Sequence, residues 1–258
     1  MSESAILALI GGAFGAVIGS FLNVCIVRLP AEQSVVSPPS RCPKCGRPVG
    51  WSDNIPVLSW LLLRGRCRGC REPISILYPL VELSVALLWA LMAWRSGLSL
   101  EALKGALFGT LLIGIALTDA REYIIPNEFT WGGLALGLIL AAAGGVDAMI
   151  TAAIGAAVGF GLLWVFGVVG TWAFKKEAMG GGDIKMMAMV GSFIGWQGVL
   201  LTVFLGALSG VLIFLPLRVL KKEEKLVPFG VFLAIGAAVT YLIGPALIAW
   251  YRRYLGVG

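Results

Sequence analysis

The stretch AMITAAIGAAVGFGLLWVFGVVGTW, residues 148–172, contains no charged side chain. A helix of this length can cross the hydrocarbon core of a bilayer, which needs about 20 mostly apolar residues. Similar runs lie near residues 5–27, 77–94, 101–118, 128–144, 184–197, 198–218 and 228–250. Only Trp196, Gln197 and Gly198 separate 184–197 from 198–218, so one long interrupted segment could replace two short ones. The sequence therefore predicts an all-α, multi-pass membrane protein of about eight transmembrane helices.

The composition supports residence in a lipid bilayer. Hydrophobic residues make up 59% of the chain and charged residues 13%, with a mean hydropathy of +0.92. An average soluble domain carries about 25% charged residues. The first apolar run follows Met1-Ser-Glu-Ser, which has no basic residue, and ends without a small-residue cleavage site. We therefore expect a retained helix there and not a signal peptide.

The distribution of the 20 Lys and Arg residues indicates an orientation. Cytoplasmic loops of membrane proteins are enriched in these residues. With the amino terminus outside, all of them except Arg95, Lys104, Arg252 and Arg253 fall on the inner side, Lys222 and Lys225 included. We expect both termini on the outer side. Because the basic residues are scattered over separate loops, the net charge of +6 does not indicate a nucleic-acid partner.

One long polar stretch, residues 29–76, interrupts the apolar runs and predicts a small cytoplasmic insert. Two Cys-x2-Cys pairs within it, Cys42/Cys45 and Cys67/Cys70, are separated by residues 46–66. This spacing is typical of a structural four-cysteine zinc site, and a glycine in or after each pair would let the backbone turn around the metal. Two disulfides or a redox motif are the alternatives, and a reducing cytoplasm disfavours structural disulfides. We expect three parts: the first transmembrane helix (1–28), the insert (29–76) and a membrane core (77–258).

Four of the 14 acidic residues lie at or near helix ends in apolar surroundings: Glu82, Asp119, Glu128 and Asp183. Burying a carboxylate is expensive, so such positions are candidates for function. Asp119 ends the run 101–118, and Asp183 opens the run 184–197, which puts both at the cytoplasmic face. Two neighbouring carboxylates share one proton, so one can serve as a base toward water and the other as an acid. Taken singly, either aspartate could instead cap a helix or pair with Arg121 or Lys185.

Gly180, Gly181 and Gly182 precede Asp183. Because glycine has no Cβ, we expect this run to let a substrate backbone approach and to free the chain from helical geometry. The chain has no histidine, which excludes Ser-His-Asp and Cys-His catalysis and any histidine-ligated metalloprotease. Gly11, Gly15 and Gly19 are spaced as a close helix-packing face, and Cys25 is expected to be buried packing.

Ordered motifs along nearly the whole chain resemble those of the bacterial type IV prepilin peptidases. They are Gly19-Ser-Phe-Leu-Asn-Val24, Arg28-Leu-Pro30, the two cysteine pairs enclosing Trp51 to Trp60, Tyr78-Pro-Leu-Val-Glu82, Asp119 with Ile125-Pro-Asn127, Gly180 to Asp183 followed by Lys185, and Pro228-Phe-Gly-Val-Phe-Leu233. The wider resemblance is to the Gly-x-Gly-Asp aspartyl proteases. Two positions depart from the family pattern: Leu77 stands where arginine is usual, and Val231 stands where a second proline is common.

The resemblance implies a multi-pass enzyme of the bacterial inner membrane. It would cleave the basic leader from prepilins or pseudopilins after a glycine at the cytoplasmic face, with Asp119 and Asp183 as the catalytic residues. It also implies methylation of the new amino terminus with S-adenosylmethionine, an activity tied to the cysteine-bearing insert. Lys185 and the three glycines belong to the same motif as Asp183, and Glu82 could contact the leader, the cofactor or a structural cation.

Two other classes of protein remain as alternatives. An ion- or proton-coupled membrane transporter would use buried carboxylates near the bilayer midplane and show internal repeats, and no repeat is visible here. A zinc-containing membrane scaffold would make the glycine run and Asp119 incidental.

Overall fold

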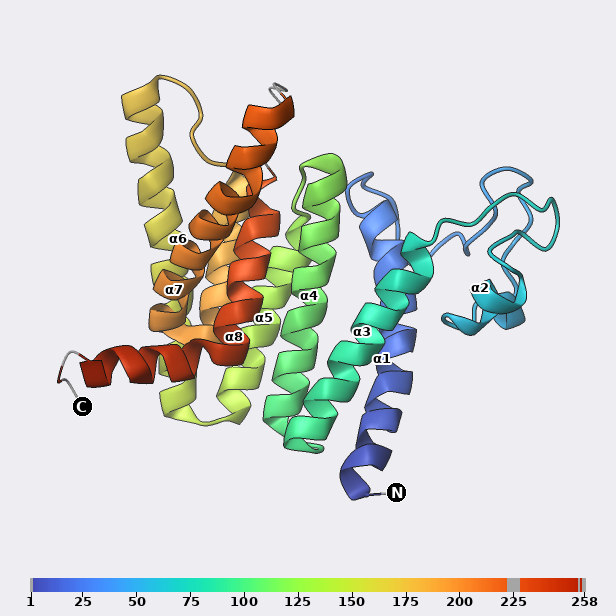
Figure 1. The fold of residues 1–258 in the computed structure, drawn as a ribbon, viewed down its shortest axis with the longest axis horizontal. Helices are drawn as coiled ribbons and strands as arrows, with labels where there is room; N and C mark the ends of the chain where they lie inside the picture. Colours follow the sequence, from blue (N-terminus) through green and yellow to red (C-terminus); the bar gives the residue numbers. More distant parts are fainter. Residues whose placement is uncertain (1, 222–227, 255, 257–258) are drawn as a thin grey trace. The chain divides into compact units, whose positions relative to one another are not determined.

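The computed structural model describes residues 2–221, 228–254 and 256, and for residues 214–221 and 252 it describes the backbone alone. In this part of the chain there is no β-strand beyond two isolated bridges in the insert. The helices are α1 (Glu3–Arg28), η1 (Trp51–Asp53), α2 (Leu58–Leu62), α3 (Leu77–Ser96), α4 (Leu100–Glu122), α5 (Asn127–Ala143), α6 (Val146–Phe174), α7 (Gly181–Lys221) and α8 (Phe229–Tyr254) (Figure 1). The prediction of an all-α fold is confirmed.

Six helices in the described part are long and apolar enough to cross a membrane: α1, α3, α4, α6, α7 and α8. The predicted count of about eight is not confirmed. The run 128–144 forms α5, whose 17 residues make it shorter than the others. The runs 184–197 and 198–218 fall on α7, in which two helical segments meet at Gly195, a residue with non-helical backbone angles (φ 70°, ψ 175°). Lys222 and Lys225, which are predicted to lie on the cytoplasmic side, are not among the residues that the structure describes.

The chain divides within α4 into two compact units, residues 1–114 and 115–258. In the first unit, α1 and α3 pack along a stripe of glycines. A Cβ at Gly15 would lie 2.6 Å from the Cβ of Trp89, and one at Gly19 would lie 2.8 Å from the Cα of Glu82. Asn23 donates to the carbonyl of Tyr78 (3.0 Å) beside this contact. The expected packing face is confirmed, and it joins the Gly19–Val24 motif to the Tyr78–Glu82 motif.

The insert between α1 and α3 contains two knuckles with matching backbone hydrogen bonds. Cys42 N–H donates to Arg47 O at 2.9 Å, and Cys67 N–H donates to Glu72 O at 2.8 Å. The residue after each second cysteine has a positive φ, Gly46 at 71° and Arg71 at 62°. Glycine therefore serves the turn in the first knuckle only. In the second knuckle the left-handed residue is Arg71 and not Gly69, contrary to expectation.

In the second unit, α7 contacts α5, α6 and α8 (Figure 1). The α6–α7 contact depends on glycine. A Cβ at Gly159 would collide with the backbone carbonyl of Met187, and one at Gly155 would collide with that of Gly191. Close approach of the two backbones fixes the position of α7, whose first turn carries Asp183.

Candidate active site and metal centre

Asp119 lies in the last turn of α4 and is 6% exposed. Its Oδ2 accepts a hydrogen bond of 3.1 Å from the backbone N–H of Val231, in the first turn of α8. A Cβ at Gly230 would lie 2.9 Å from the same oxygen, a distance that real Cβ atoms essentially never show. The start of α8 therefore covers the carboxylate closely, and the helix N-terminus suits a negative charge.

Asp183 lies in the first turn of α7, directly after the glycine run. Gly181 and Gly182 are already part of this helix, so the expectation that they free the chain from helical geometry is wrong. The Oδ1 of Asp183 is buried and, among the described residues, has no hydrogen-bond partner. A buried polar atom without a partner is rare and costly, and such atoms occur at catalytic sites.

Ile125, in the loop between α4 and α5, joins the surroundings of the two aspartates. A Cβ at Gly182 would lie 3.0 Å from the Ile125 Cβ, and one at Gly230 would lie 2.7 Å from its Cδ1. The end of α4 and the start of α7, which are far apart in the sequence, therefore bring the two carboxylates near each other.

Lys185 does not neutralise this site. Its Nζ donates to Asn127 Oδ1 at 2.9 Å, which links the first turn of α7 to the start of α5. Within the described part of the chain, neither aspartate forms an ion pair. This arrangement gives no support to the alternative in which Asp119 and Asp183 pair with Arg121 and Lys185.

The first unit contains the four-cysteine cluster. The Sγ atoms of Cys42, Cys45, Cys67 and Cys70 all lie within 4.8 Å of one another, with Cys42–Cys70 at 3.7 Å and Cys45–Cys67 at 4.0 Å. Zn–S bonds of about 2.3 Å in tetrahedral geometry place sulfurs about 3.8 Å apart, whereas a disulfide needs about 2.05 Å. All four cysteines are free, and the cluster could hold a metal ion.

Local hydrogen bonds already favour thiolates at part of this cluster. Backbone N–H groups of Cys70 and Gly69 lower the pKa of Cys67 to about 6, and those of Cys45 and Lys44 lower the pKa of Cys42. The backbone N–H of Glu72 also lowers the pKa of Cys70, but desolvation and hydrogen bonds with the other thiols raise it to about 11. Thiolates are the metal-binding form of cysteine.

Glu82 lies on α3, in the first unit, and is 9% exposed. Its Oε2 accepts a 2.7 Å hydrogen bond from the backbone N–H of Val57. In the described part of the chain it forms no ion pair, so the structural cation considered for it is not found there.

Sequence reasoning did not assign a role to Gly230, Val231 or Asn127, which contact Asp119 or Lys185 in the structure. All three occur in the motifs that resemble the prepilin peptidases. Position in a motif was the only signal for them, because their roles depend on contacts between α4, α5, α7 and α8.

Fold and site together define a multi-pass membrane protein with a neighbouring pair of aspartates, Asp119 buried and Asp183 half-buried, and a four-cysteine cluster. Comparison with known proteins gives the family. Residues 13–96 match the bacterial peptidase A24 N-terminal domain, and residues 106–215 match the type IV leader peptidase family. The chain belongs to the type IV leader peptidase family.

Curated relatives agree with this assignment. The chain is 37% identical to the prepilin leader peptidase/N-methyltransferase of Aeromonas hydrophila, over 92% of this chain and 91% of that protein. It is 34% identical to the protein of the same name from Pseudomonas putida, over 98% and 96% of the two chains. With the Myxococcus xanthus (strain DK1622) protein it shares 45% identity over 78% of this chain and 61% of that one. No solved structure matches the chain significantly.

These relatives confirm the resemblance predicted from the motifs and the class of enzyme. The transporter alternative finds no support among them.

Proposed function

We propose that this protein removes the basic leader peptide from type IV prepilins or pseudopilins at the cytoplasmic face of the bacterial inner membrane and methylates the new amino terminus. The peptidase activity is supported mainly by the closeness of Asp119 and Asp183. Ile125 lies against both Gly182, next to Asp183, and Gly230, which covers Asp119. The methyl-transfer half is supported by the names of the relatives.

In the proposed mechanism Asp119 and Asp183 act on either side of the scissile peptide bond. We assign the role of base to Asp119, since the Val231 N–H donates to its Oδ2 and holds it as a hydrogen-bond acceptor. It takes a proton from the water that attacks the carbonyl carbon. Asp183 donates a proton to the leaving amine as the C–N bond breaks, and the shared proton returns after product release. Gly180, Gly181 and Gly182 leave room for the substrate backbone beside Asp183, and Lys185 holds the helix start against Asn127.

We assign a structural zinc ion to Cys42, Cys45, Cys67 and Cys70. Four thiolates fill a tetrahedral shell, so the ion would hold the two knuckles together and take no part in chemistry. Outside the cluster, the Lys44–Glu72 ion pair at 3.0 Å joins the two knuckles through exposed side chains. We retain the division into residues 1–28, 29–76 and 77–258 as part of the proposal.

The proposed substrate has an apolar helix behind a basic leader. Such a helix can pack laterally among the spans in the bilayer while its leader stays in the cytoplasm. This requires the active site to face the cytoplasm and both termini to lie outside, as the distribution of Lys and Arg indicates.

The purified full chain in detergent tests this proposal directly. We expect it to shorten a prepilin by its leader and, with S-adenosylmethionine present, to add one methyl group to the product, both read by mass spectrometry. A prepilin in which the glycine before the cleavage site is replaced serves as the control and should stay intact. An uncut native prepilin would overturn the peptidase assignment, and a cut but unmethylated product would restrict the function to cleavage.

A further inference from the structure

The loop between α4 and α5, residues 123–126, is held in place at both ends. Tyr123, with a φ of 56°, ends α4 and donates its N–H to the carbonyl of Asp119 at 3.0 Å, and Pro126 is the N-cap of α5. A residue before proline is restricted to extended backbone, and a β-branched side chain has few rotamers. Ile125 therefore has a well-defined position relative to Asp119, the residue to which its loop is hydrogen-bonded.

The side chain of Ile125 lies between the two glycines that adjoin the aspartates. A Cβ at Gly182, the residue before Asp183, would lie 3.0 Å from the Cβ of Ile125, 3.4 Å from its Cγ1 and 3.5 Å from its Cδ1. A Cβ at Gly230, which covers Asp119, would lie 2.7 Å from the same Cδ1. On both sides Ile125 meets glycine, which has no side chain that could move aside. In packing as tight as this, even one added methyl group is costly.

The rest of the glycine run is open where Ile125 is crowded. A Cβ at Gly181 would meet nothing within 4 Å, and one at Gly180 would meet only the carboxylate of Asp183, at 3.1 Å. Both glycines are exposed, and Ile125 is half-buried, so it is accessible from outside. A substrate backbone can therefore approach along Gly180 and Gly181, and Ile125 is the bulky side chain that it meets beside the aspartates.

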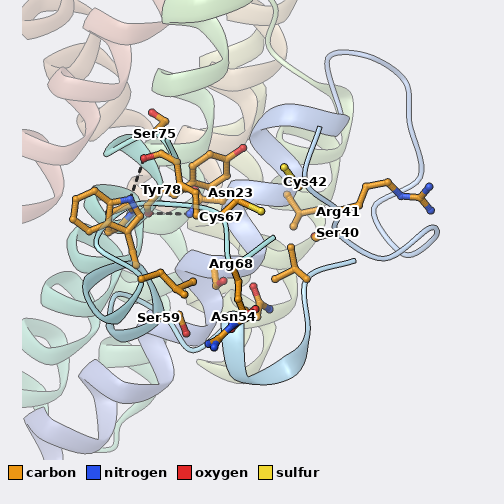
Figure 2. A pocket seen from close by; sticks show the side chains of 18 of the residues that line it. Asn23, Ser40, Arg41, Cys42, Asn54, Ser59, Cys67, Arg68, Ser75 and Tyr78 are labelled. Atoms are coloured by element: carbon orange, nitrogen blue, oxygen red, sulfur yellow. Dashed lines mark hydrogen bonds and ion pairs between the residues drawn. The ribbon is translucent and has the colours of Figure 1, made fainter. Parts of the chain in front are cut away.

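Residues that select the substrate at the scissile bond must lie near the two carboxylates. The pocket shown in Figure 2 is lined by side chains of residues 20–82 alone. It therefore contributes none of the contacts described around Asp119 and Asp183. Ile125 is the side chain that contacts the surroundings of both aspartates.

We propose that Ile125 is a specificity-determining residue: its side chain fills the space that a side chain on the residue before the scissile bond would need. The inference rests on the proposed function and deepens it by naming the residue that selects the substrate. For both carboxylates to reach one peptide bond, the substrate backbone must pass beside Ile125. Glycine can do so, whereas a larger residue would push the peptide bond away from the carboxylates. A misplacement of about 1 Å can cost about 100-fold in rate.

An exchange of volume between enzyme and substrate tests the proposal. Ile125→Ala removes three carbon atoms, as many as the side chain of valine contains. The full chain in detergent should cleave a prepilin with valine before the cleavage site at least about 100-fold more slowly than one with glycine. Ile125→Ala should cleave the valine prepilin at least about tenfold faster than wild type does. The matched variant Ile124→Ala, at the exposed neighbouring position, should keep the wild-type preference.

A gain of activity toward a larger substrate cannot result from loss of structure. If Ile125→Ala cleaves the glycine prepilin but gains nothing toward the valine prepilin, the proposal is overturned. If it cleaves neither, the smaller change Ile125→Val, of a kind that costs little in a packed core, decides the question. This variant should raise the rate for an alanine prepilin relative to the glycine prepilin, and an unchanged ratio would equally overturn the proposal.

Disulfide trapping tests the contact itself without cleavage. Ile125→Cys is combined with Asp183→Asn, which prevents cleavage, and is oxidised together with a prepilin that carries cysteine before the cleavage site. Two cysteines can bond only when their Cα atoms lie within about 7 Å of each other. Mass spectrometry should therefore find the prepilin linked at position 125, with far less linkage when Ile124→Cys replaces Ile125→Cys. Absence of a link at position 125 would refute the contact.

Failure of this inference differs from failure of the proposed function. If the wild-type chain cleaves the glycine prepilin and the Ile125 variants keep the full preference for glycine, the function stands and the assignment of Ile125 is wrong. If the wild-type chain cleaves no prepilin at all, the peptidase assignment fails along with the inference.

Discussion

Asp119 and Asp183 have different surroundings, although residue type and position give no sign of this. The backbone of α8 donates a hydrogen bond to Asp119, while Asp183 has a buried oxygen without a partner among the described residues. Both aspartates could be singled out from sequence because a carboxylate at the end of an apolar run is costly. The contacts of Gly230 and Val231 could not, since they join residues of α4 and α8 that are far apart in the chain.

Gly230→Ala should impair leader cleavage severely. The new Cβ would lie 2.7 Å from Ile125 Cδ1 and 2.9 Å from Asp119 Oδ2, so α8 or the carboxylate must move. A misplacement of about 1 Å can cost about 100-fold in rate. Cleavage of a prepilin by Gly132→Ala, on α5 with nothing within 4 Å of its Cβ, should match wild type. Normal cleavage by Gly230→Ala would mean that this contact does not position Asp119.

Val231→Pro removes the N–H that donates to Asp119. Proline is tolerated in the first turn of a helix, so we expect folding but about tenfold slower cleavage, the effect of losing one hydrogen bond to a charged group. Val231→Ala retains the N–H and should cleave at the wild-type rate. Equal cleavage rates for the two variants would show that this hydrogen bond does not contribute to catalysis.

At the scale of elements, the apolar runs predicted helix positions well. Each of the eight predicted runs falls on a helix, and 184–197 and 198–218 fall on α7, in which two helical segments meet at Gly195. The position of this break could not be predicted from sequence, because the φ of 70° is a local property of one glycine with helical residues on both sides. Likewise, the cysteine spacing predicted two knuckles, but not that Arg71 adopts the left-handed conformation in the second.

Gly159→Ala should destabilise the contact between α6 and α7. Its Cβ would collide with the Met187 carbonyl, and overpacking of this kind costs about 1–3 kcal/mol. Gly161→Ala, two residues along α6 with open space around it, should be neutral or stabilising by up to about 1 kcal/mol because alanine favours helix. Thermal unfolding in detergent measures both. Identical melting temperatures for the two variants would contradict the packing shown here.

The insert should contain about one zinc ion per chain, measured by elemental analysis of the purified protein. Cys42→Ser with Cys45→Ser should remove the metal and unfold the insert, which becomes sensitive to protease. Cys25→Ser, a change at the buried cysteine of α1, should retain the metal in full. Full zinc occupancy in the double variant would refute the ligand set.

At the scale of the whole molecule, the chain divides into two compact units, with the cysteine cluster in the first and Asp119 and Asp183 in the second. Motifs and charge sufficed to predict the class of protein and the family. They did not reveal which elements surround the aspartate pair, because these surroundings depend on the packing of α4, α7 and α8. Such contacts follow from shape complementarity between whole helices and from no single motif.

The central claim is that Asp119 and Asp183 act as one catalytic pair. The most direct measurement is the rate of leader cleavage by Asp119→Asn, Asp183→Asn and the double variant, with Asp147→Asn at the exposed start of α6 as the matched control. We predict a loss of about 100- to 10,000-fold in each single variant, little further loss in the double variant, and no loss in the control. Wild-type cleavage by either single variant, in a protein that remains folded, would contradict the account.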